Sequence, residues 1–344
     1  MSDAIKRQIV ADVLAHKPEI TVNHPNAPTL FRSAMDECPK ALAYIAGVGY
    51  SAPLMMRGFT FKITYSQTDV PAKNIFRADS AADVEDILHR AISGIMNPII
   101  IAAPMGVPVM DAYSSFNVAY NGFYSNLVGT GVSSWNLSGY SFAFVRFEFK
   151  YRIGKVKLLM MERDVDKEVD RLARLLFSPD MRPETKAYVA HNYLARNVEY
   201  WLKEDANPLE MSYRQSAYGA LINKKCVCQG YAEAYKRLLD SQGIANYVLC
   251  GKVKGSAVHH AWNAVSFNGR DFYHVDVTWD SRGGGLSSQQ YFCKTDEDMR
   301  PTRIWTRRAG VICNSTTNIG SIAREDILYN RGKYISQGID KNNF

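Results

Sequence analysis

The order of apolar and polar residues predicts that the chain begins with helices. Ile5, Ile9 and Val13 recur at the spacing of one helix face. A second helix is expected over residues 30–45, where apolar residues are again frequent. Residues 1–55 are therefore predicted to form a helical lead-in to the rest of the protein.

A change to strict alternation marks the second part of the chain, residues 56–162. Phe59, Phe61 and Ile63 alternate with polar residues, which is the pattern of a half-buried strand. Another alternating strand is expected over 141–150, and a helix is predicted between the two. This part is predicted to be a β-rich α+β domain that shapes a cleft or, alternatively, binds a partner.

The third part, residues 163–340, is predicted to form an α+β core. Apolar residues at helical spacing indicate helices over 164–177 and 184–203, with His191 at the surface or at the edge of the core. A further helix begins at Cys228 in the segment VCQGYAEAYKRLLDSQG. Two alternating segments follow, HHAWNAVSF and DFYHVDVTW, and each is predicted to be a strand. The expected fold is a helix packed on an antiparallel sheet.

The composition is that of an ordinary globular protein. The 344 residues are 47% apolar and 22% charged, which is enough to build more than one core. Lysine and arginine exceed aspartate and glutamate by 41 to 34, giving a net charge of +7. The sequence has no uninterrupted basic cluster of the kind that binds nucleic acid. We therefore expect no nucleic-acid partner.

The N-terminus and the cysteines bear on compartment and metal content. The first residues contain acids and lack the apolar core of a secretory signal. The most apolar stretch, 98–110, is short and contains two prolines, so that it cannot span a membrane. Six cysteines in a chain of this length do not indicate a disulfide scaffold, and Cys226 and Cys228 are too close for the usual zinc spacing. We expect a cytoplasmic protein with reduced thiols, no metal, no cofactor and no membrane association.

Cys228 is the candidate nucleophile. It begins a helix whose stripe includes Tyr231 and Tyr235 and whose end is marked by Gly243. Unpaired backbone N–H groups at a helix N-terminus favour a thiolate, as a neighbouring imidazole does, and they can also hold a developing oxyanion. A buried cysteine that only begins a core helix is the alternative. Cys226, which precedes the helix, is expected to be a bystander.

The histidine and the aspartate that could complete such a site lie in the two predicted strands. Asn268-Gly269 marks a hairpin turn between them. A two-residue loop would put His260 and Asp276 on opposite faces of the sheet, whereas a three-residue loop, 267–269, shifts the register by one and sets them opposite each other. We predict this second register, or an equivalent bulge, because the imidazole and the carboxylate can then form a hydrogen bond.

Two other histidines are weaker candidates for the base. His259 adjoins His260, but in this register its side chain points to the packing face, so a flanking role is expected. His274 lies on the same face as His260, with packing against Trp262 as its alternative role. Neither displaces His260 as the candidate base.

Five segments in the same order resemble the bacterial transglutaminase-like domain, a branch of the papain-like thiol enzymes. They lie within 184–305 and read KAYVAHNYLARNVEY, SAYGALINKKCVCQGYAEAYKRLLDSQGI, HAWNAV, YHVDVTWD and YFCKTDEDM. The resemblance implies that Cys228 is the nucleophile, that His260 is general base and acid, and that Asp276 orients His260. It says little about residues 1–160.

Further residues are candidates for holding an oxyanion or the substrate: Gln215, Tyr218, Gln229, Gly230, Trp262 and Asn263. The resemblance implies a side-chain oxyanion donor upstream of the cysteine, and the first two are the residues available there, with packing as the alternative for Tyr218. Gly230 would let the backbone of a substrate approach closely. Trp262 and Asn263 are expected either to support the strands or to line the cleft.

Together these residues predict a thiol enzyme that attacks an amide or thioester carbonyl and forms an acyl-enzyme. Water as the acceptor would make it a peptidase or deamidase, and an amine would make it a transglutaminase; the sequence leaves both open. The resemblance favours a protein or peptide substrate. The alternative is a non-catalytic protein-binding module that reuses the fold. The oligomeric state is left open.

Overall fold

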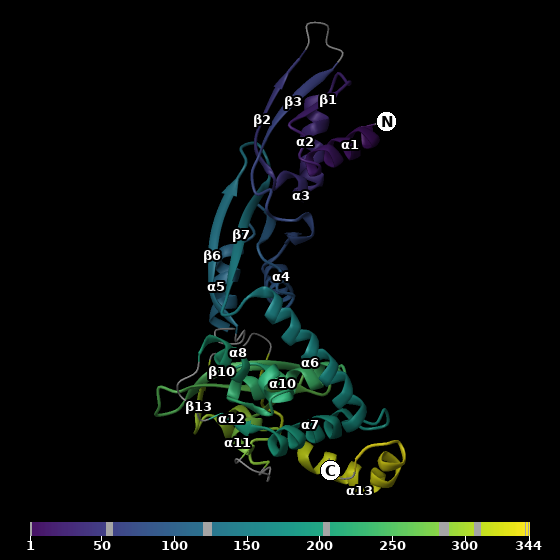
Figure 1. The fold of residues 1–344 in the computed structure, drawn as a ribbon, viewed down its shortest axis with the longest axis vertical. Coiled ribbons are helices and arrows are strands. Elements are labelled where there is room, and N and C mark those ends of the chain that lie inside the picture. Colours follow the sequence, from purple (N-terminus) through teal and green to yellow (C-terminus); the bar gives the residue numbers. More distant parts are fainter. Residues whose placement is uncertain are drawn as a thin grey trace. The chain divides into compact units, whose positions relative to one another are not determined.

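The computed structural model describes residues 2–52, 58–119, 126–201, 207–281, 289–305, 311–340, 342 and 344. The chain folds into two compact units, and many of their elements are labelled in Figure 1. Unit 1 comprises residues 1–116 and 127–150, and unit 2 comprises residues 117–126 and 151–344. Within the described ranges no helix is both long and apolar enough to cross a membrane.

The elements of unit 1 are α1 (Ser2–Leu14), β1 (Glu19–Val22), α2 (Ala27–Glu37), α3 (Pro39–Leu42), β2 (Ile45–Ser51), β3 (Phe59–Tyr65), the short 3₁₀ helix η1 (Ala72–Asn74), β4 (Ile75–Arg77), α4 (Ala81–Ser93), β5 (Ile99–Pro104), α5 (Val109–Ala119), β6 (Leu127–Asn136) and β7 (Phe142–Tyr151). They form two sheets. The first is antiparallel with the order β1-β3-β2, and the second has the order β4-β5-β7-β6 with β4 parallel to β5.

A core in unit 1 extends across both of its sheets. Phe31 of α2 stacks on Phe61 of β3 with ring centres 4.4 Å apart, and the same cluster extends from Ile9 of α1 to Phe144 of β7. Residues 1–55, which the sequence divides off as a lead-in, therefore share the core of the β-rich part that follows them. The predicted alternation of β3 is observed, with Phe61 buried between more exposed neighbours.

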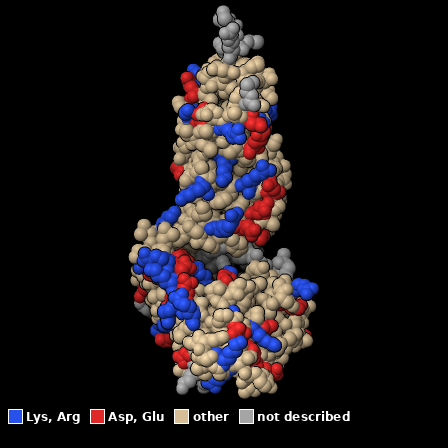
Figure 2. All heavy atoms as spheres, turned by 90° about the vertical axis from the view of Figure 1, so that its right-hand side faces the viewer, with Lys and Arg blue, Asp and Glu red and all other residues tan. Residues whose placement is uncertain are grey.

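Charged side chains are mixed over the surface. On the face drawn in Figure 2, lysine and arginine side chains lie among aspartate and glutamate side chains. Several form ion pairs, such as Arg146 with Asp69 at 2.7 Å and Arg237 with Glu162 at 2.8 Å. On this face the positive excess is therefore spread out rather than gathered into one patch.

The elements of unit 2 are α6 (Lys155–Leu176), α7 (Pro183–Asn197), β8 (Glu199–Tyr200), α8 (Pro208–Arg214), α9 (Ala217–Leu221), β9 (Lys225–Cys226), α10 (Cys228–Asp240), β10 (Ala245–Val253), β11 (His259–Ser266), β12 (Phe272–Val275), α11 (Val277–Asp280), α12 (Asp296–Met299), β13 (Arg303–Trp305) and α13 (Ile319–Ser336). The main sheet has the order β12-β11-β10-β13 and is antiparallel. β8 and β9 form a separate parallel pair.

The main sheet of unit 2 separates two apolar layers, because successive side chains of a strand point to opposite faces. Val265 of β11 and Tyr273 of β12 belong to the larger core, which also contains the inner faces of α6, α7 and α10. Trp262 and Ala264 belong to a second core together with Leu249 of β10. The unit is thus an α+β fold in which α10 packs on one face of an antiparallel sheet, as predicted.

Two predictions about the helix 184–203 need correction. The helix ends at Asn197, because the next residues pair in parallel with β9, which lies far along the sequence. His191, expected at the surface or at the edge of the core, is fully buried, and its Nε2 lies 3.0 Å from Oδ2 of Asp280. This contact joins α7 to α11.

The hairpin between β11 and β12 has a longer loop than predicted. Residues 267–271 connect the strands, a five-residue loop instead of three residues. Asn268 stabilises the longer loop, since its Oδ1 accepts hydrogen bonds from the backbone N–H groups two and three residues later, each at 2.9 Å. The predicted pairing of His260 with Asp276 is therefore wrong by two residues. Because side chains alternate with a period of two, this shift still leaves both on one face.

Gly219 of α9 determines how closely this helix approaches its neighbours. A Cβ atom there would lie 2.2 Å from the carbonyl oxygen of Tyr213 and 2.9 Å from that of Lys225. We expect Gly219→Ala to lower the free energy of unfolding by about 1–3 kcal/mol, measured by urea denaturation, because both backbones must move. Gly332→Ala at an exposed position of helix α13, where nothing lies within 4 Å of the added Cβ atom, is the control and should stabilise by about 0.5–1 kcal/mol. An unchanged stability of Gly219→Ala would contradict this packing.

Candidate active site

Cys228 is held at the first turn of α10. Val227 before it has an extended backbone and is the N-cap residue, while Tyr231 and Tyr235 on the same helix are fully buried. Gly243, with a φ of +67°, follows the helix end as predicted. The buried rings fix the helix against the core, and the partly exposed Cys228 is thereby fixed as well.

Three of the predicted site residues meet at this helix end. Nε2 of His260 lies 2.7 Å from Oδ2 of Asp276. The His260 side chain and the backbone N–H of Ala261 are near enough to the Cys228 thiol to lower its pKa. Because Asp276 occupies Nε2, Nδ1 is the ring nitrogen left to face the sulfur. The structure therefore brings the three together from α10, from β11 and from the residue after β12.

Asp276 is held in place by the chain around it. The strand predicted over 271–279 ends one residue before Asp276, which is instead the N-cap of α11. Its Oδ1 accepts a hydrogen bond from the backbone N–H of Trp279 at 3.2 Å, and its own N–H donates to the carbonyl of Tyr291 at 2.9 Å. Aspartate is favoured at such a capping position, which explains why the strand stops here. Oδ2 is left to face His260.

Arg303 joins the site, and sequence analysis missed it. It lies on the edge strand β13, its side chain is buried, and its guanidinium forms a hydrogen-bonded ion pair with Oδ2 of Asp276. The guanidinium carbon lies 3.6 Å from the centre of the Trp279 ring, a cation–π contact. Within the described part of the chain, its Nε and Nη1 atoms have no hydrogen-bond partner. The sequence carries no local signal for the pairing of β13 with β10 that places Arg303 here.

The charges of these residues shift one another's pKa values. Burial raises the pKa of Cys228, but the hydrogen bond and the charge of His260 lower it more, so that the pKa lies below that of an ordinary thiol. Burial lowers the pKa of His260, but Asp276 outweighs it and raises the pKa to about 9. Burial likewise raises the pKa of Asp276, yet His260 and Arg303 together hold it below its usual range. These shifts favour a thiolate beside an imidazolium at neutral pH.

Trp262 supports the His260 ring. The two rings stack with their centres 5.7 Å apart, and the indole N–H donates to Nδ1 of His274 at 2.9 Å. Nε2 of His274 in turn lies 2.9 Å from Oδ1 of Asp296. Only 1% of Trp262 is exposed, so that of its two expected roles support fits the structure and lining a cleft does not.

His274, Asp296 and Cys313 are described residues whose ligand atoms lie within 4.8 Å of one another, as a metal site would require. The tautomer of His274 does not fit a metal. Nδ1 accepts the Trp262 N–H, so that Nε2 carries the ring proton toward Asp296. Burial lowers the pKa of His274, which keeps the ring neutral. Because neither nitrogen then has a free lone pair, we assign His274 and Asp296 to the support of Trp262.

The polar candidates around the cysteine have packing partners of their own. Gln215 accepts a hydrogen bond from Arg152 at 3.4 Å, and the ring of Tyr218 stacks on Tyr213 with centres 5.1 Å apart. Gln229 donates to a carboxylate one turn later on α10 at 3.1 Å. These contacts favour the packing alternative for Tyr218.

Gly230 and Asn263 serve the packing of α10. A Cβ atom on Gly230 would lie 2.6 Å from Cβ of Cys226 and 2.8 Å from the carbonyl oxygen of Ser216. The close approach of the helix to its neighbours requires this glycine, whereas the sequence suggested an approaching substrate. Asn263 is buried, and its Nδ2 donates to the carbonyl of Ala232 at 3.0 Å, which ties β11 to α10.

Tyr200 is an aromatic residue that sequence analysis placed inside a helix and did not consider for the site. It lies in β8, where the parallel pairing with β9 sets it opposite Cys226. Burial raises the pKa of Tyr200, and the charge of Cys228 raises it further. Its phenol is therefore within electrostatic reach of the Cys228 sulfur. A phenolic O–H in such a place can donate to an oxyanion.

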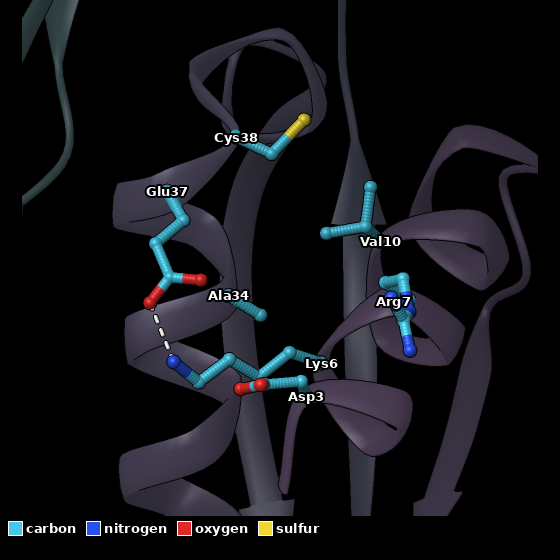
Figure 3. A pocket seen from close by; sticks show the side chains of 7 residues that line it. All are labelled: Asp3, Lys6, Arg7, Val10, Ala34, Glu37 and Cys38. Carbon is cyan, nitrogen blue, oxygen red and sulfur yellow. Dashed lines mark hydrogen bonds and ion pairs between the residues drawn. The ribbon is translucent and has the colours of Figure 1, made fainter.

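A cavity of about 320 Å³ lies in unit 1, between α1 and α2. Figure 3 shows the ion pair of Lys6 with Glu37, at 2.5 Å, on its wall. The lining residues are Asp3, Lys6, Arg7, Val10, Ala34, Glu37 and Cys38. None of them belongs to the candidate site, and this ion pair accounts for two of the lining charges.

Comparisons with known proteins match part of this chain. Residues 170–277 match the family model described as the transglutaminase-like superfamily. This segment contains Cys228, His260 and Asp276, whereas Arg303 lies beyond it. A comparison with curated proteins found no match.

Solved structures similar to this chain include three at low sequence identity. A candidate cysteine protease from Cytophaga hutchinsonii is 12% identical, over 47% of this chain and 68% of its own, with a TM-score of 0.28. A TGase is 16% identical, over 60% of this chain and 59% of its own, with a TM-score of 0.28. A candidate protease from Parabacteroides distasonis is 10% identical, over 55% of this chain and 44% of its own, with a TM-score of 0.26. This chain spans less than two thirds of the latter two.

The pKa shifts predict which thiol reacts first with iodoacetamide. Burial raises the pKa of Cys226 well above that of an ordinary thiol and raises the pKa of Cys250 to about 12, whereas that of Cys228 is lowered. At about pH 6.5 we expect Cys228 to be alkylated at least about tenfold faster than the other cysteines, measured by peptide mass spectrometry. The rate should rise as the pH passes the pKa of Cys228, and in His260→Ala this rise should move to higher pH.

Cys226→Ala is the matched control for this measurement, since it removes the neighbouring thiol and should leave the pH profile of Cys228 unchanged. Alkylation of Cys228 no faster than that of Cys38 in unit 1 would contradict the electrostatic assignment.

Proposed function

We propose that this chain, which carries a transglutaminase-like domain over residues 170–277, is a thiol-dependent acyltransferase or hydrolase. The observation that supports this most is that His260 pairs with the Asp276 carboxylate and lowers the pKa of the Cys228 thiol. A nucleophile is thereby joined to a base, and the base to a group that orients it. In this proposal Cys228 is the nucleophile, His260 the acid and base, and Asp276 the orienting residue.

The first step is the attack of the Cys228 thiolate on the carbonyl carbon of an amide or thioester. A carbon–sulfur bond forms, and the carbonyl electron pair moves onto the oxygen. As this tetrahedral intermediate collapses, the His260 imidazolium gives its Nδ1 proton to the departing amine or thiol. The products of this step are the leaving group, an acyl thioester on Cys228 and a neutral His260.

The second step transfers the acyl group to an acceptor. Neutral His260 takes a proton from water or an amine at Nδ1 while the acceptor attacks the thioester, and Cys228 leaves as a thiolate. Asp276 keeps Nε2 protonated throughout, so that Nδ1 is the nitrogen that exchanges protons. Water as the acceptor gives a peptidase or deamidase reaction, and an amine gives a transglutaminase reaction.

We propose that the oxyanion is held by Tyr200 together with the N-terminus of α10. The backbone N–H groups of the first helical turn surround Cys228, and a helix N-terminus favours a negative charge. The phenol of Tyr200 would add a side-chain donor, a part for which Gln215 and Tyr218 were the earlier candidates. The pairing of Tyr200 opposite Cys226, two residues before Cys228, supports this choice, and the charge of Cys228 raises the pKa of Tyr200 in agreement with it.

The proposed substrate is an amide within a protein or peptide. The transglutaminase-like match supports this class, and the partial exposure of Cys228 is consistent with a substrate that reaches the site from the surface. A reducing compartment such as the cytoplasm would keep the thiol free for reaction.

A non-catalytic binding module is the weaker alternative. Buried ion pairs contribute little net stability, so that a protein that only binds partners gains little from one. Asp276 is nevertheless fully buried between His260 and Arg303, next to a partly exposed thiol. An arrangement of this kind is typical of a reacting site.

An activated ester would test for the acyl-enzyme. We expect p-nitrophenyl acetate to add one acetyl group to Cys228 and to release p-nitrophenol in a burst, followed by intact-protein and peptide mass spectrometry. Cys228→Ala should abolish both signals. Asp276→Asn should slow the burst by on the order of a thousandfold or more, because the imidazole is no longer held in the required tautomer.

Cys226→Ala is again the matched control and should retain the burst. Acceleration of turnover by methylamine, with methylamide product, would assign amine transfer, and no acceleration would assign hydrolysis. Acetylation of Cys226 in place of Cys228 would contradict the choice of nucleophile.

The role of Tyr200 can be tested with the same ester. We expect Tyr200→Phe to slow acylation about 100-fold, as the loss of one oxyanion donor does in other enzymes, with little change in folding. Tyr329→Phe on α13, where the side chain is 82% exposed, is the control and should acylate at the normal rate. A normal rate in Tyr200→Phe would remove Tyr200 from the proposed oxyanion site.

A further inference from the structure

One carboxylate oxygen of Asp276 serves two cations. Oδ2 lies 2.7 Å from Nε2 of His260 and also forms the ion pair with Arg303. Asp276 is 0% exposed and Arg303 is 1% exposed. A carboxylate that only orients a histidine needs no second cation. The buried arginine therefore requires an explanation of its own.

The orientation of the Asp276 carboxylate does not depend on Arg303 alone. Oδ1 is held by the backbone N–H of Trp279 at 3.2 Å, and Oδ2 is already engaged by His260. Arg303 is itself fixed, because its guanidinium lies on the Trp279 ring and its backbone pairs with Val253. What Arg303 adds to an already positioned carboxylate is a permanent positive charge.

The proposed reaction changes the charge next to this carboxylate. Before attack, His260 is an imidazolium whose charge balances Asp276. Once the proton has passed to the leaving group, the ring is neutral, and Asp276 without another partner would be a lone buried anion, which is strongly unfavourable. Arg303 remains beside Asp276 in both states and balances its charge in the second.

We propose that Arg303 is a positioning residue that acts on His260 through Asp276: by sharing Oδ2 it weakens the hold of the carboxylate on the imidazolium, and it thereby makes His260 a better proton donor to the leaving group. The inference rests on the proposed function, in which His260 moves that proton. The effect of Arg303 on His260 is opposite to that of Asp276, which stabilises the imidazolium.

Several elements place titratable groups around the His260 ring: Cys228 on α10, Asp276 before α11, His274 on β12 with Asp296 behind it, and Arg303 on β13. The thiolate and the carboxylate both favour the imidazolium. His274 is neutral and is separated from His260 by the ring of Trp262. Of these groups, Arg303 is the one whose charge opposes the imidazolium.

Replacing Arg303 with a neutral hydrogen-bond donor separates its charge from its contacts. In Arg303→Gln the amide can still donate to Oδ2 but carries no charge. We expect the titration midpoint of His260, about 9 in the unaltered protein, to rise by about one pH unit. Arg303→Lys retains a cation and should keep the midpoint near the original value. NMR of ¹⁵N-labelled histidine in the substrate-free protein measures both.

Arg270→Gln is the matched control, since this arginine lies exposed in the hairpin loop and its loss should leave the midpoint unchanged. A midpoint that is unchanged or lower in folded Arg303→Gln would overturn the inference. If Arg303→Gln does not fold, Arg303→Lys provides the test. A His260 midpoint raised by about one pH unit in Arg303→Lys, despite the retained cation, would also overturn the inference.

A second measurement compares two leaving groups. p-Nitrophenolate departs from an ester without needing a proton, whereas an amine departing from a p-nitroanilide needs one. We expect Arg303→Gln to slow acylation by the anilide up to about tenfold more than acylation by the ester, which corresponds to one unit of pKa. Equal slowing of both would contradict a role in proton donation. If the unaltered protein acylates with neither compound, the proposed function fails, while the NMR result still tests the link between Arg303 and His260.

Discussion

Oδ2 of Asp276 is the atom through which the fold and the proposed chemistry are connected. The aspartate follows the last residue of β12 and caps α11, so that the backbone determines where its carboxylate lies. His260 reaches it from β11 and Arg303 from β13. Because β10 lies between these two strands in the sheet, the positions of both cations depend on the pairing of the whole sheet.

Electrostatics rather than burial distinguishes Cys228 from the thiols near it. Burial is the largest influence on the pKa of each of the three thiols, Cys226, Cys228 and Cys250. Burial alone raises the pKa of a thiol. Among these three thiols, Cys228 is the one whose pKa is lowered, because the effect of His260 outweighs that of burial. Asp276 in turn raises the pKa of His260 and favours the charged imidazole. The reactivity of the Cys228 thiol therefore depends on Asp276 as well as on His260.

The sequence predicts well those elements and site residues that depend on neighbours close along the chain. The helix beginning at Cys228 and the strand bearing His260 follow from the periodicity of apolar residues. The predicted hairpin register was wrong by two residues, and because this number is even, the prediction still placed His260 and Asp276 on one face of the sheet. Tyr200 and Arg303 were missed because each depends on pairing between strands far apart in sequence, β8 with β9 and β13 with β10. The core shared by residues 1–55 and the later strands of unit 1 was hidden for the same reason.

Arg303 reaches the site from β13, a strand of three residues at the outer edge of the sheet. Short edge strands have one hydrogen-bonding neighbour, and they are among the parts of a domain that open most readily without global unfolding. A brief detachment of β13 would take the guanidinium away from the carboxylate while the helix bearing the sulfur stayed folded. Under the proposed role of Arg303, detachment of β13 would change the acidity of the buried His260 ring, and a molecule that binds or displaces this edge strand would change the rate of the proposed reaction.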